Sequence, residues 1–186
     1  SAVDAGSTRL WRYPSRRREA ESILDSGLAF TGALDLTMGG PGFDTFKPNT
    51  NYVRNYIPRE SFDAEHFRRM VYMYRVRMET DATFGIFDCP DAGQVAAQRA
   101  TSTTALQAMN LLNSPFMMQQ VDLFAKRLTD HAGDDVTKQV DRAFELTFGR
   151  SPTDTERNAA ADLIAEHGLT AFCRAVLNAN EFLIIP

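Results

Sequence analysis

The chain has 186 residues, of which 44% are apolar and 24% are charged, and its net charge is −4. This length and composition fit one globular domain with a sizeable core and exclude a disordered chain. The negative charge excludes general attraction to nucleic acid or to an anionic membrane. No apolar run approaches the roughly 20 residues that cross a bilayer, so we expect no membrane insertion.

The N-terminal segment is polar and is followed by one helical period. Residues 1–6 are small and polar and do not resemble a signal peptide, and we expect the chain to be a domain of a longer protein. Apolar residues recur at helical spacing between Ser15 and Leu34, which predicts a helix with Ser15 as its N-cap. The Gly-Gly-Pro-Gly segment at 39–42 ends this pattern and predicts a turn.

The segment that follows has no clear period. Residues 43–60 are rich in Asn, Pro and Tyr, which predicts a long irregular excursion, and residues 61–67 predict a helical turn. Residues 70–78 alternate between two faces and predict a short strand. A helix is the alternative, because the residues His66, Met70, Met73 and Arg77 also recur at helical spacing.

After a loop at 80–102 the sequence predicts helices to its end. Thr103 or Thr104 caps a helix that runs to Asn113, and Ser114 caps the next, with a proline at its first position. Thr153-x-x-Glu156 is a capping box that opens a later helix. Glycines mark the helix ends, at Gly133, Gly149 and Gly168. The sequence therefore predicts a mainly α single domain over 1–186, a helical bundle with a small β element and the irregular excursion near residues 39–60.

Three arginines and the N-terminus of a predicted helix form the candidate ligand site. Arg75 and Arg77 point to one side of the predicted strand, and Arg99 precedes a helix N-terminus, where backbone N–H groups favour anions. Together these arginines can hold a sulfate, phosphate or carboxylate. The alternative, which we favour, is that they pair with Asp88, Asp91 or Glu79 and fasten the loop to the helices.

Two carboxylates and one amide complete the candidate set. Asp88 and Asp91 flank a Cys-Pro pair and can act as a cation or acid/base pair, but turn hydrogen bonds around the proline are the simpler interpretation. Gln107 lies within the helix that follows and is the sixth candidate. Two cysteines, Cys89 and Cys173, match no zinc or haem spacing. We expect free, partly buried thiols, with a disulfide as the alternative.

No other pattern carries recognisable chemistry. Three histidines lie far apart and in no metal-binding spacing, so we expect them at the surface (His66, His131 and His167). The sequence predicts no metal site and no cofactor, and it contains no P-loop, dinucleotide fingerprint or nucleophile elbow. The basic run Arg16–Arg18 is expected to be a solvated patch, or a docking surface for an acidic neighbour.

Several pieces of sequence, in the same order, resemble a known family. The chain resembles the planctomycete-specific C-terminal domain of unknown function. The matching segments are Arg18–Glu21, Ala33–Pro41, Phe87–Asp91, Arg99, Thr103–Ala108, Leu111–Pro115, Phe148–Thr153 and Leu177–Phe182. The family pattern often has a cysteine where this chain has Val95 and a proline where it has Ala105. The resemblance implies an exported, periplasmic or cell-surface protein that also carries a planctomycete-type cytochrome c module. It implies no chemistry.

Two functions stay open from sequence alone, and whether the chain is an enzyme is not decided. The first is a non-catalytic accessory or interaction module that contacts other domains of the parent chain and binds a small anion or an anionic glycan. The second is a catalytic domain in polysaccharide breakdown or oxidation, coupled to a cytochrome. Convergence of the charged candidates in an open pocket favours a ligand or catalytic site, whereas their use in internal pairs favours the module.

Overall fold

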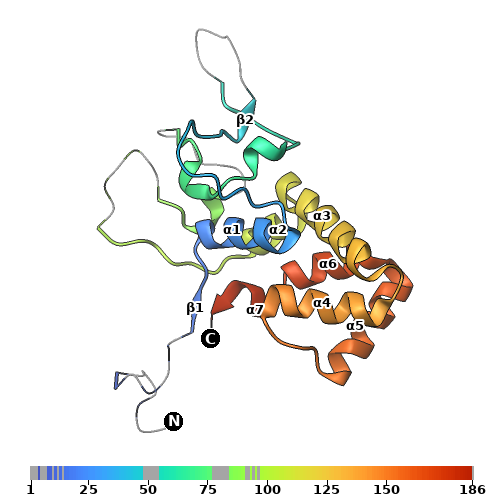
Figure 1. The fold of residues 1–186 in the computed structure, drawn as a ribbon. Coiled ribbons are helices and arrows are strands. Elements are labelled where there is room, and N and C mark those ends of the chain that lie inside the picture. The colour runs from blue at the N-terminus through green and yellow to red at the C-terminus, as the bar shows by residue number, and fades with distance from the viewer. Residues whose placement is uncertain are drawn as a thin grey trace.

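The computed structural model describes residues 4, 8–9, 11, 13, 15–47, 55–76, 84–90, 93, 95 and 97–185. Within these ranges the helices are α1 (Ala20–Thr31), α2 (Ala105–Asn113), α3 (Pro115–Ala132), α4 (Val136–Phe148), α5 (Asp154–His167), α6 (Leu169–Leu177) and α7 (Asn180–Leu183). The described strands form two antiparallel pairs, which are β1 (Arg16–Arg17) with β4 (Ile184–Ile185) and β2 (Phe46–Lys47) with β3 (Ile57–Pro58). Single 3₁₀ turns are η1 (Ala64–His66), η2 (Met70–Tyr72) and η3 (Gly85–Phe87). The predicted mainly α fold with a small β element is confirmed (Figure 1).

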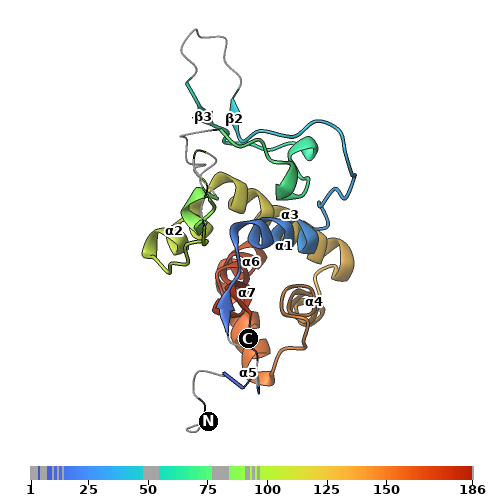
Figure 2. The same cartoon turned by 90° about the vertical axis from the view of Figure 1, so that its left-hand side faces the viewer.

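Helix α3 is the centre of the core. It contacts α1, α2, α4 and α6, and its inner face includes Phe124 and Leu128, which are fully buried. The Phe124 ring lies 5.0 Å from that of Phe30 on α1. Truncating a buried phenylalanine to alanine costs about 3–5 kcal/mol, so this contact fixes α1 against α3. The excursion lies on one side of the α1–α3 pair and α4–α7 lie on the other (Figure 2).

The predicted start of the first helix is wrong. Ser15 is not its N-cap, because α1 begins at Ala20 with Glu19 in the N-cap position. The residues before it are held as extended chain: Arg16 and Arg17 pair with β4, and the Arg18 amide donates to the Leu183 carbonyl at 2.8 Å. Pairing with the far end of the chain therefore overrides the local helical period.

The predicted helix starts in the second half are confirmed where local hydrogen bonds set them. Thr104 and Gln107 form a capping box at α2, and Thr153 and Glu156 form another at α5. The Ser114 side chain accepts from the third residue of α3, whose first residue is a proline. Each cap satisfies an N–H that has no partner inside the helix.

The predicted excursion is only partly irregular over its described residues, because β2 and β3 pair within it, and the predicted strand at 70–78 is wrong over its described part. Met70–Tyr72 is a 3₁₀ turn, and only Met73 makes a bridge, with Phe43. Arg68 organises this region from a buried position. Its guanidinium donates to the backbone carbonyls of Thr37, Gly39 and Pro41 at 2.6–2.8 Å. The same group stacks 3.9 Å from the centre of the Tyr72 ring, so the glycine-rich turn is wrapped around one arginine.

No helix within the described ranges combines the length and apolar character that crossing a bilayer needs.

Candidate functional site

Asp88 lies at the centre of the loop that precedes α2. Its φ of 56° is in the left-handed region, which only Asn, Asp and Gly adopt readily. This geometry aims the carboxylate at Ser102, whose amide donates at 2.6 Å and whose hydroxyl donates at 2.8 Å. The carboxylate is thus occupied by internal donors and ties η3 to the approach of α2.

Gln107 is the hub of the same network. Its side chain is fully buried, and its Nε2 donates to the Ile86 carbonyl at 2.9 Å and to Ser102 Oγ at 3.1 Å. Its Oε1 accepts from the Thr104 amide at 3.1 Å and from the Arg17 guanidinium. One amide therefore joins η3, the N-terminus of α2 and strand β1.

Arg99 joins the loop to α1. It donates to Glu19 at 3.1 Å and to Glu21 at 2.6 Å, and its Nε donates to the Asp88 carbonyl at 3.3 Å. Burial lowers the pKa of Arg99, but the hydrogen bond and charge of Glu21, together with the charge of Glu19, raise that pKa above its usual value. The predicted pairing is thus found with different acids, because Arg99 binds glutamates of the α1 start and not an aspartate side chain.

The other candidates are placed as follows. Arg75 donates to the Pro90 carbonyl at 3.0 Å, whereas Arg77 and Asp91 lie outside the described residues. Both cysteines are free thiols. Burial raises the pKa of Cys89, whose sulfur lies 3.7 Å from Glu21 Oε1, and burial raises the pKa of Cys173 to about 12. Neither thiol is poised as a nucleophile at neutral pH.

Two adjoining hollows flank strand β1, next to this network. Their volumes are about 510 and 320 Å³, and both are lined by Ser15, Arg16, Arg17 and Thr103. The larger hollow also reaches Arg18, Thr101 and Ser102, while the smaller one reaches Thr104 at the start of α2, Asn178 and Asn180. We call the two hollows together the β1 groove.

The arginines of the β1 groove differ in their partners. Arg17 is turned inward to Gln107, with its guanidinium 5.6 Å from the centre of the Phe87 ring. Arg16 is exposed, lies 5.3 Å from the Tyr13 ring and has no acidic partner among the described residues. The basic run is therefore only partly the solvated patch that the sequence predicts.

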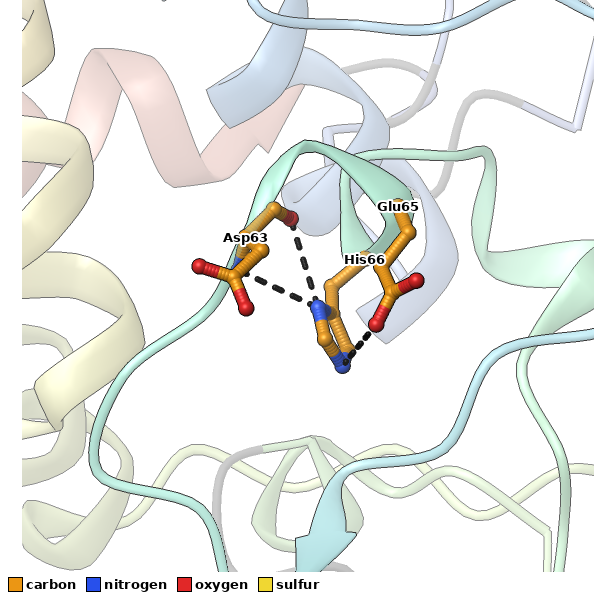
Figure 3. Close-up of side chains that lie close together, drawn as sticks. All are labelled: Asp63, Glu65 and His66. Carbon is orange, nitrogen blue, oxygen red and sulfur yellow. Dashed lines mark hydrogen bonds and ion pairs between the residues drawn. The ribbon is translucent and has the colours of Figure 1, made fainter.

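A third hollow, of about 460 Å³, lies in the excursion. It is lined by the glycine-rich turn, Arg68, Arg59, Glu65 and His66, with the carboxylates of Asp35 and Asp44. The expected surface position is confirmed for His131 and His167, which are exposed, but it is wrong for His66, whose residue is only 2% exposed. His66 lies between Asp63 and Glu65 on η1 (Figure 3).

One of the comparisons with known proteins identifies a family. A family model described as PSD1, a protein of unknown function (DUF1553), matches residues 1–164. The chain belongs to this family. The search of curated proteins and the search of solved structures both return no match. The match covers β1, the Arg99–Gln107 network and all three hollows except the residues after 164.

Sequence reasoning missed two of these features. The hollow at His66 gave no signal, because its walls come from turns that only the fold brings together. The β1 groove gives a partial signal in the Arg16–Arg18 run, which the sequence predicts to be a solvated patch or a docking surface for an acidic neighbour. Its position beside the predicted Arg99 and Gln107 could not be read from the chain, because strand β1 pairs with the distant β4.

Proposed function

We propose that this domain is a non-catalytic accessory module that binds an anionic, hydroxyl-bearing ligand, such as a sulfated or carboxylated glycan, in the β1 groove. The proposal depends on the exposed position of Arg16 in the groove. Arg16 lines both hollows, of about 510 and 320 Å³, and forms no ion pair with a described acid, since Glu19, which also lines the larger hollow, is paired with Arg99. An unpaired arginine at a concave surface is a ready partner for sulfate or carboxylate.

The rest of the groove suits the same ligand class. Thr104 caps α2 at its edge, and the first two amides of α2, those of Ala105 and Leu106, have no acceptor within the helix. Such a helix start favours negative charge. The hydroxyls of Thr101 and Thr103 supply further donors and acceptors, which a sugar's own hydroxyls match.

The nearby charges support binding over catalysis. The Asp88 carboxylate is occupied by Ser102 and Gln107, and Glu19 and Glu21 are occupied by Arg99. No described carboxylate of this network is left as a free acid or base, so the alternative of polysaccharide cleavage or oxidation has less support. In this proposal the domain serves the other domains of an exported, cytochrome-c-linked parent protein, as the resemblance implies.

The test is a calorimetric titration of the domain with a sulfated oligosaccharide, with a neutral oligosaccharide of the same length and with sodium sulfate. We expect binding of the sulfated sugar that weakens with salt, and at least tenfold weaker binding by Arg16→Gln, since a charged hydrogen bond contributes about 1.5–3 kcal/mol. Arg142→Gln is the matched control, because Arg142 lies on α4 outside the groove.

Each outcome decides between specific alternatives. Equal loss in Arg16→Gln and Arg142→Gln would show general charge attraction and overturn the groove. Binding of the neutral sugar alone would remove the anionic part of the proposal. A turnover of either sugar by the domain would instead support the catalytic alternative.

A further inference from the structure

The η1 turn places three metal-binding groups side by side, away from the β1 groove. One ligand atom from each of Asp63, Glu65 and His66 lies within 4.8 Å of the others. His66 is buried and its ring is fixed, whereas Asp63 and Glu65 are exposed, with the Asp63 side chain accepting from the His66 backbone amide in a capping box. Figure 3 shows the imidazole between the two acids on this single turn.

The surroundings of the His66 ring hold it in one orientation. The rings of Phe43 and Phe62 meet it edge-on, at centroid distances of 6.3 and 5.9 Å. Its Nδ1 lies 3.1 Å from the Asp63 amide nitrogen and 3.3 Å from the Asp63 carbonyl oxygen. The Asp63 amide can therefore donate to Nδ1, or the Asp63 carbonyl can accept from it, which allows either neutral tautomer of the imidazole.

The second ring nitrogen faces a carboxylate at a useful distance. Nε2 lies 3.9 Å from Glu65 Oε1, and both residues line the 460 Å³ hollow. Zinc bonds to nitrogen and oxygen are about 2.0–2.2 Å long, so tetrahedral ligand atoms lie roughly 3.3–3.6 Å apart, and a small rotation of the exposed Glu65 side chain would bring its carboxylate to that distance. A proton on Nδ1 donated to the Asp63 carbonyl leaves the Nε2 lone pair free, which is the second-shell arrangement typical of metal-bound histidine.

We propose that His66 Nε2 and the carboxylates of Glu65 and Asp63 hold a divalent cation of the Zn²⁺ class, with water from the hollow completing its coordination. The mixed nitrogen and oxygen donor set suits zinc and its first-row neighbours and not calcium or magnesium. Charge around the hollow is compatible with a cation. Arg59 is paired with Asp44 at 3.2 Å, and the Arg68 guanidinium donates to three backbone carbonyls.

The chain contains its own control. His167 Nε2 lies 3.5 Å from Glu166 Oε1 at the end of α5, which is the same neighbouring Glu-His pair. The side chains of His167 and Glu166 are 56% and 77% exposed, and neither belongs to the metal-ligand cluster at η1. If an adjacent glutamate and histidine were enough to bind zinc, this pair would bind as well as the η1 site.

The experiment is calorimetric titration of the metal-free chain with ZnCl₂. We expect one zinc per chain, and at least tenfold weaker binding by Glu65→Gln and by Asp63→Asn, because even outer-shell changes cost 10–100-fold in metal affinity. Glu166→Gln should bind as the unchanged chain does. Absence of a 1:1 site, unchanged affinity in both η1 variants, or equal loss in Glu166→Gln would each overturn the proposal.

Nuclear magnetic resonance gives a readout that does not depend on replacing the buried histidine. In ¹⁵N-labelled protein, one equivalent of ZnCl₂ should shift the His66 Nε2 resonance to that of a metal-bound nitrogen and leave Nδ1 protonated. The His167 resonances should stay in place. A response of His167 alone, or of His66 through Nδ1, would contradict the assigned geometry.

Discussion

Replacing Gln107 by leucine tests whether the network beside α2 is structural. The change keeps an apolar stem of similar size at a position with no solvent exposure. It removes the donor to the Ile86 carbonyl and the acceptor for the Thr104 amide and for Arg17. Each backbone or side-chain group left without a partner costs about 1–3 kcal/mol, at the lower end here because the bonds are only part-buried.

Three such losses near the lower end of that range sum to about 3–5 kcal/mol. For a chain of this size each kcal/mol shifts the melting temperature by about 2–4 °C, so we expect Gln107→Leu to melt about 10 °C lower. The assay is thermal unfolding followed by far-ultraviolet circular dichroism. Leu106→Ala is the control, because the neighbouring Leu106 is 68% exposed and should shift the transition little. A Gln107→Leu transition within about 2 °C of the unchanged chain would refute the reasoning.

Three further predictions concern the charged pairs and the thiols. Arg99→Ala should lower the melting temperature by about 2–4 °C, because partly exposed ion pairs contribute about 1 kcal/mol. An unchanged melting temperature together with lost binding of the sulfated sugar would instead make Arg99 a ligand-binding residue. The Arg150 hydrogen bond lowers the pKa of Glu156 to about 2 in the folded chain. The ionised Glu156 therefore contributes to the free energy of unfolding above about pH 5, and this contribution is lost as the pH falls toward 2. Urea titrations between these pH values should therefore show a shallower loss of stability for Glu156→Gln. Adding reductant should leave the urea unfolding midpoint unchanged, because Cys89 and Cys173 are free thiols. A fall of about 2–4 kcal/mol in the free energy of unfolding would mean that the two cysteines are bridged.

Controls for the last group follow from the same structure. Asp162 lies on the same helix as Glu156 and forms no ion pair or side-chain hydrogen bond with the described residues, so Asp162→Asn should keep the steep acid dependence. An equal slope in Glu156→Gln and in the unchanged chain would show that the Arg150 pair does not contribute to acid stability. For Arg99, the Arg142→Ala variant removes an exposed helix pair and should melt as the unchanged chain does.

The sequence by itself determined those helices whose first residues are set by hydrogen bonds between residues close together in the chain. Thr104, Ser114 and Thr153 each accept a hydrogen bond from a residue three positions later, and such bonds need only the local chain. The same locality explains why Gly149, at a φ of 70°, was found as a helix end. The helical half of the fold and the approach of Gln107 to a helix start could therefore be predicted.

The tertiary structure alone decided the rest. Strand β1 exists because Arg16 and Arg17 meet Ile184 and Ile185 from the opposite end of the chain, and no local period encodes that pairing. His66 is buried because the ring of Phe43, from 23 residues earlier in the chain, packs edge-on against it together with the nearby ring of Phe62. Interactions between residues far apart in sequence depend on the closure of the whole chain, and both the β1 groove and the hollow beside η1 are products of that closure.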